Sequence, residues 1–198
     1  MYNYFTRSRQ KDLLYTSAAA AFLPPITIEP EVALNKAWAA IEVADQFSQA
    51  VEKLFLEAEG RLEVDPTYYN NAVETKNTLL RLVIDTGNAS NAVRLILPSL
   101  VPDILLIAEN LDDFTQILKE IVLMFYFHRI NNLNIPNLQI YKDRFQYGIA
   151  NYLESARAAA LRARALVEAY IAYKAAINAE LSTPVPVQDL VNLINSYI

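Results

Sequence analysis

The sequence predicts an all-α protein, a multi-helix bundle with one very long helix in its C-terminal half. Hydrophobic residues make up 54% of the 198 residues and charged residues 20%, a balance that excludes a disordered chain. Only three glycines occur, Gly60, Gly87 and Gly148, which is too few for the tight turns of a β-sheet protein. Apolar residues also recur at helical spacing through most of the chain.

The chain divides into three predicted parts: an arm with a short helix at residues 1–25, a helical bundle domain at 26–181, and a tail with a short helix at 182–198. Pro24 and Pro25 end the first short helix, and the last one is expected at Asp189–Tyr197. The arm is aromatic and basic, and we expect it to dock on another surface. Its candidate interface residues are Tyr2, Tyr4, Phe5, Arg7 and Arg9.

The first long helix is predicted to begin at Pro30, which lies between Glu29 and Glu31 at a first-turn position, and to leave through Gly60. Both signals are typical of helix ends. The apolar residues of this helix recur at helical spacing and predict its buried stripe. They are Val32, Ala39, Val43, Phe47, Ala50, Leu54 and Ala58, with Trp38 and Ile41 beside them.

A second helix is predicted from Asp65 as the cap and Pro66 in the first turn to Gly87. Its apolar positions are Tyr69, Val73, Leu79, Leu80 and Val83. Residues 89–111 contain two prolines amid apolar residues and predict two short buried helices, hinged near Pro98 and Pro102.

Asp112 and Asp113 are then expected to cap a core helix that ends in Arg129, where a cation suits the helix C-terminus. A loop follows at residues 131–137. The Asp112 and Asp113 pair is interpreted as a cap rather than as a metal site.

Residues 138–181 predict one helix about 66 Å long, while a compact domain of this size is only roughly 40 Å across. The helix must therefore project from the body or break at Gly148. With Ile149 at heptad position a, every a and d position up to Ile177 is apolar, and most e positions extend the stripe. The a and d residues are Ile149, Tyr152, Ala156, Ala159, Ala163, Leu166, Tyr170, Tyr173 and Ile177.

A second set of apolar residues lies off this stripe: Ala158, Leu161, Ala165, Ile171 and Ala172. Two interpretations stay open. The alanines supply helix propensity and nothing more, or the second set is a close-packed contact with another helix or a neighbouring copy. We take the second as the working hypothesis and treat these five residues as interface candidates.

The sequence lacks the residue motifs of known catalytic, cofactor-binding and metal-binding sites. A net charge of −5 argues against broad nucleic-acid binding, and without cysteine there is no thiolate chemistry or cysteine metal site. His128 is the single histidine and is interpreted as structural. We predict no catalytic, cofactor-binding or metal-binding residue, no cofactor, and no enzymatic activity.

Leu13–Ile28 is the longest uncharged run, and its two prolines make it too short to span a bilayer. We therefore predict neither a transmembrane segment nor a secretion signal. The expected location is a virion or the cytoplasm of the host cell.

In overall architecture the chain resembles the small helical head-tail connector and adaptor proteins of tailed phages. This resemblance implies a structural virion component, with copies of itself and other structural proteins as partners and with a ring as one candidate arrangement. No residue motif carries it.

Two alternatives come from other features. Residues 141–177, with Gly148, Tyr152 and Leu153, resemble the helices of TolC-type efflux channels, which implies a long helical hairpin in an envelope protein. The acidic residues of the first helix would instead suit a soluble binding module or inhibitor with a basic partner. They are Glu42, Asp45, Glu52, Glu57 and Glu59.

Overall fold

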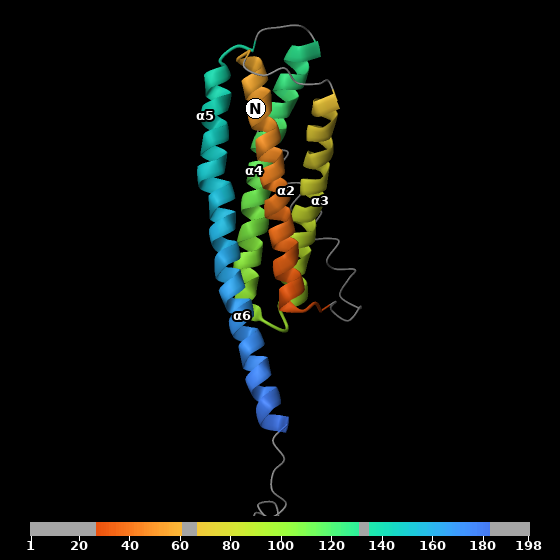
Figure 1. Cartoon of the computed structure of the whole chain (residues 1–198), viewed down its shortest axis with the longest axis vertical. Helices are drawn as coiled ribbons and strands as arrows, with labels where there is room; N and C mark the ends of the chain where they lie inside the picture. The colour runs from red at the N-terminus through yellow and green to blue at the C-terminus, as the bar shows by residue number, and fades with distance from the viewer. Residues whose placement is uncertain (1–26, 61–66, 131–134, 183–198) are drawn as a thin grey trace, which may run out of the picture.

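The computed structural model describes residues 27–60, 67–130 and 135–182, and within them the predicted all-α bundle is confirmed. Four long helical segments run alternately up and down (Figure 1). They are α2 (Pro30–Ala58), α3 (Thr67–Val93), α4 (Val101–Ile130) and a last segment made of α5 (Leu138–Gly148), a π-helical turn (Ile149–Leu153) and α6 (Glu154–Ser182). Both α3 and α6 pack against α2 and α4.

The core is built from heptad-like rows, because the most buried residues of each helix are separated alternately by three and four positions. This spacing is typical of helices that cross at small angles in four-helix bundles. The row of α4 with its preceding turn is Leu100, Ile104, Ile107, Leu111, Phe114, Leu118, Ile121 and Phe125; that of α2 is Ala33, Ala37, Ala40, Ala44, Phe47, Val51 and Leu54.

Large side chains on α4 face small side chains on its neighbours. Every member of the α4 row is leucine, isoleucine or phenylalanine, whereas α2 contributes four alanines and α6 contributes Ala156, Ala159, Ala160 and Ala163. Alternating large and small residues fill the space between helices without voids. The alanines of α2 and α6 therefore accommodate the bulk of α4.

Thr86, Ser90 and Thr115 are fully buried hydroxyl residues of the bundle. Thr86 and Thr115 donate to the carbonyls of Leu82 and Leu111, one turn earlier, at 2.8 and 2.5 Å. Ser90 donates to the carbonyl of Gly87 at 2.7 Å. Because each hydroxyl is satisfied within its own helix, burial leaves no unpaired donor at these positions.

The predicted ends of the first helix are confirmed, and part of its stripe is wrong. Pro30 lies in the first turn of α2, and Gly60 has a φ of 70°, as a left-handed exit requires. Val32, however, is 44% exposed, and Ala58 is exposed as well. The buried row starts one residue later, at Ala33, because it is set by contact with both α3 and α4.

The predicted end of the second helix at Gly87 is wrong. The α3 helix continues to Val93, with Ala89, Ser90 and Val93 buried, and the buried face outweighs the helix-breaking tendency of one glycine. The predicted capping residues Asp65 and Pro66 lie outside the described residues, as do the arm at 1–25 and the helix at Asp189–Tyr197.

The two short helices predicted at residues 89–111 are also wrong. The chain turns after α3, forms the short 3₁₀ turn Pro98–Leu100, and enters α4 without interruption. Pro102 lies in the first turn of α4, where its missing N–H costs nothing. Asp112 and Asp113 are not a cap, because both are exposed in the middle of α4, which ends at Ile130, one residue beyond the predicted end at Arg129.

The long C-terminal helix is perturbed where the sequence indicated. Phe145 and Gly148 are buried on α5, and the next buried residue is Leu153, five positions on, so the π-helical turn absorbs one extra residue. The buried row of α6 then runs through Ala156, Ala160, Ala163 and Val167, and the helix continues past the lower end of the bundle (Figure 1).

Substituting Gly148 tests this close packing. A Cβ at Gly148 would lie 3.0 Å from Cδ2 of Phe114, which is fully buried and cannot move freely. We expect Gly148→Ala to lower the free energy of unfolding by about 1–2 kcal/mol in urea denaturation, since overpacking outweighs the helix-propensity gain of alanine.

Gly87→Ala is the matched control, because no atom lies within 4 Å of its Cβ position. We expect it to raise the free energy of unfolding by about 0.5–1 kcal/mol. If Gly148→Ala stabilised the protein to the same extent, the tight contact with Phe114 would be refuted.

Candidate functional site

A cluster of three polar side chains joins α2, α3 and α4 at the upper end of the bundle. The Glu57 carboxylate accepts a hydrogen bond from the Tyr69 hydroxyl at 2.8 Å and pairs with the Arg129 guanidinium at 2.7 Å. The guanidinium also lies 4.7 Å from the centre of the Tyr69 ring. Each member is near the end of its helix, so the cluster fixes three helix ends relative to one another.

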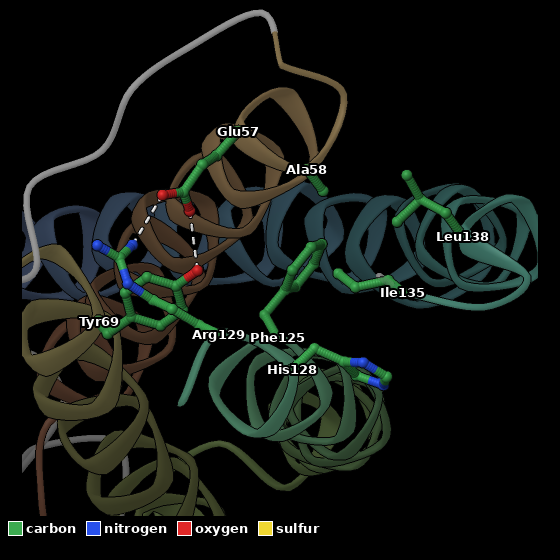
Figure 2. A pocket seen from close by; sticks show the side chains of 8 residues that line it. All are labelled: Glu57, Ala58, Tyr69, Phe125, His128, Arg129, Ile135 and Leu138. Carbon is green, nitrogen blue, oxygen red and sulfur yellow. Dashed lines mark hydrogen bonds and ion pairs between the residues drawn. The ribbon is translucent and has the colours of Figure 1, made fainter. Parts of the chain in front are cut away.

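A pocket of about 410 Å³ opens beside this cluster. Figure 2 shows Glu57, Tyr69 and Arg129 on one side of it and Phe125, Ile135 and Leu138 on the other. His128 lies at the rim of the pocket, with its ring turned away from Glu57. The rings of His128 and Phe127 meet edge to face, with 5.7 Å between their centroids. Among the described residues, His128 Nδ1 is buried and has no hydrogen-bond partner.

Burial changes the acid–base properties of this cluster. It raises the pKa of Tyr69 to about 12; the hydrogen bond with Arg129 opposes this rise and the one with Glu57 adds to it. The pKa of Arg129 is raised, first by its hydrogen bond with Tyr69. The phenol therefore stays protonated at neutral pH. With Glu57 and Arg129 paired as well, the cluster acts as a structural clamp.

This clamp was not predicted from the sequence. Glu57 and Arg129 are 72 positions apart, and Arg129 was assigned only to its own helix end. The usable signal was the short distance along the chain between Glu57, in the last turn of one helix, and Tyr69, in the first turn of the next. Within the described ranges, no three histidine or acidic side chains group as metal ligands would.

The predicted interface residues of α6 form a second candidate site. Ala158, Leu161, Ala165, Ile171 and Ala172 are all exposed, with Leu161 at 57% and Ile171 at 41%. We call the surface formed by Ala158, Leu161, Ala165 and Ala172 the outer face of α6. Ile171 lies in the row of Arg157 and Arg164, on the flank toward α2. The other predicted interface residues, Tyr2, Tyr4, Phe5, Arg7 and Arg9, lie outside the described residues.

Cations on α6 tie the flanks of this helix to its neighbours. Arg157 pairs with Asp45 of α2, and Arg162 pairs with Asp103 of α4 at 2.9 Å. Arg164 lies 4.9 Å from the centre of the Trp38 ring of α2. These contacts lie along the two edges where α6 meets α2 and α4. The outer face between them carries alanines and Leu161, with the exposed Glu154 and Glu168 in the row of Leu161.

The heptad prediction for α6 is partly correct. Ala156, Ala159 and Ala163 are fully buried, whereas Tyr173 is 65% exposed, so its predicted burial in the stripe is wrong. Leu153, Ala160 and Val167, which occupy heptad position e, are buried too. The buried stripe is therefore centred between positions a and e. The shift follows from the π-helical turn, which rotates α6 relative to α5.

Comparisons with protein-family models, with curated proteins and with solved structures gave no match to this chain. No helix in the described part of the chain has the length and apolar character that crossing a membrane requires.

Tyr69 predicts a pH dependence at alkaline pH. Its folded-state pKa of about 12 lies above the ordinary value of 10.0, so the unfolded chain loses the phenol proton first. The stabilisation is complete below pH 10 and is lost as the pH rises toward 12. We expect the free energy of unfolding, measured in urea between pH 9 and pH 12, to fall less steeply for Tyr69→Phe than for the native chain.

Tyr126→Phe serves as the control, because this tyrosine is exposed and lies outside the clamp. Its pH profile should match that of the native chain. Parallel profiles for Tyr69→Phe and the native chain would show that the phenol of Tyr69 is not the group that titrates.

Proposed function

We propose that this protein is a non-enzymatic subunit of a homomeric helical assembly, in which the outer face of α6 binds the same face of a second copy. One observation carries the proposal: this face exposes Leu161 among alanines, with Ile171 exposed on the adjoining flank, although the seam of α6 toward the bundle already accounts for folding. Exposed large apolar side chains on a regular helix favour a partner.

The outer face is self-complementary for a second copy related by a two-fold axis. If two α6 helices pair antiparallel with Ala165 on the axis, Ala158 of one copy lies opposite Ala172 of the other. The same register sets Leu161 of one copy beside Glu168 of the other, and Arg162 beside Ala169. Small residues then allow close approach of the two helices.

The alternative of an acidic module for a basic partner receives less support. Three of the five acidic residues on which this alternative rests already pair with cations of the same chain: Asp45 with Arg157, Glu57 with Arg129, and Glu59 with Lys142. Of these five residues, only Glu42 and Glu52 would be left to contact a basic partner. The phage-connector and TolC-like assignments stay predictions, since neither rests on a described contact.

The test introduces a charge at the centre of the proposed contact. Ala165→Glu would bring two carboxylates together on the two-fold axis and block close approach of the helices. Size-exclusion chromatography with light scattering should give twice the chain mass of 22.4 kDa for the native protein. The variant should be monomeric at the same concentration, with unchanged helical circular dichroism.

Asn88→Glu is the matched control, because it also adds one negative charge at an exposed helical position, on α3 rather than α6. It should leave the native mass unchanged. A native protein that stays at 22.4 kDa at millimolar concentration, or an Ala165→Glu variant of undiminished mass, would remove the proposal.

A further inference from the structure

The bundle-facing seam of α6 continues below the bundle. After Val167, the last buried residue described on this helix, Tyr170, Lys174 and Ile177 keep the same alternate spacing of three and four positions. The adjacent Tyr173 is 65% exposed. A core-type pattern thus extends beyond the end of α2, where no other described helix accompanies it (Figure 1). We call Tyr170, Tyr173 and Ile177 the lower seam.

The described chain begins at the lower end of the bundle, on the side of α3 (Figure 1). Glu29, directly before α2, pairs with Lys174 of α6 at 3.5 Å. The backbone N–H of Ile28 donates to the carbonyl of Ala92 near the end of α3 at 3.3 Å. These two contacts anchor residues 28 and 29 at the lower end of the bundle. Residues 1–26 therefore join the bundle at its lower end, where Glu29 contacts α6 and Ile28 contacts α3.

The composition of the preceding residues matches the lower seam. Residues 13–26 read LLYTSAAAAFLPPI and carry no charge, so they gain by leaving water. Fully extended, they span about 46 Å, whereas residues 170–182 of α6 span only about 18 Å. Their alanines allow a close approach to the tyrosine side chains of α6.

We propose that residues 13–26 pack on the lower seam of α6 in the same chain and extend the hydrophobic core below the bundle. The neighbouring anchor at Glu29 makes the contact intramolecular, which gives it a high effective concentration. This contact uses the opposite side of α6 from the outer face, so it does not depend on the proposed assembly. It assigns a binding role to an apolar segment that would otherwise remain in water.

Two other occupants compete for the lower seam. Residues 183–198 follow α6 directly, but they start at its far end with Thr183, Pro184 and Pro186 and would have to reverse direction. A second copy could also bring its own lower seam. Each of these two occupants would give a different crosslinked product from the one expected for residues 13–26.

The experiment places the photo-crosslinking residue p-benzoylphenylalanine at position 173 of the full chain. It replaces one aromatic side chain with another at an exposed position, so folding should be preserved. After irradiation, we expect a product of single-chain mass in which position 173 is joined to a peptide from residues 13–26. Leu14→Asp in the same chain should reduce this product at least about fivefold, since a charge opposes burial.

The same residue placed at position 161, on the outer face, is the control and should give no link to residues 13–26. Links from position 173 to residues 183–198, a product of double mass, or no link at all would each overturn the proposal. A loss of self-association in Ala165→Glu with an intact link from position 173 would separate this inference from the proposed assembly.

Discussion

The packing of α4 against alanine-rich neighbours is the constraint on which the bundle depends. The α4 row is large throughout and buried throughout, from Leu100 to Phe125. Helices carrying large residues on both sides of such a row would be forced apart, and the core would lose contact density. The alanines of α2 and α6 are thus a structural requirement. The same requirement explains why α2 and α4 contact each other across the bundle as well as through their neighbours.

This constraint accounts for only part of the alanine content of α6. Ala156, Ala159, Ala160 and Ala163 face the core and are explained by the bulk of α4. Ala158, Ala165 and Ala172 are exposed and face no described element, so core packing gives no reason for them. Helix propensity would explain alanine there. It would not explain the exposed Leu161 among these alanines or the exposed Ile171 on the adjoining flank, since neither side chain is stabilised by contact with water.

Sequence signals predicted helix ends correctly where a single residue determines the backbone conformation. They failed where packing against other helices determines where a helix ends. Pro30 fixes its own φ, and Gly60 readily adopts the positive φ of a helix exit, so the ends of α2 could be predicted. Gly87, Asp112 and Asp113 were misread as helix ends because each favours a terminus only weakly, and a long buried face overrides such a preference. The clamp of Glu57, Tyr69 and Arg129 depends on how three helices end together, which no local pattern encodes.

The length of the last helix relates the two surfaces of α6 to each other. The π-helical turn after Gly148 sets which side of α6 meets the bundle, and with it which side becomes the outer face. Because the helix stays continuous to Ser182, both sides extend together past the lower end of the core. A covered lower seam would hold this projection rigid, and a rigid projection loses less entropy when a second copy binds. Intramolecular packing on one side of α6 would therefore strengthen association on the other.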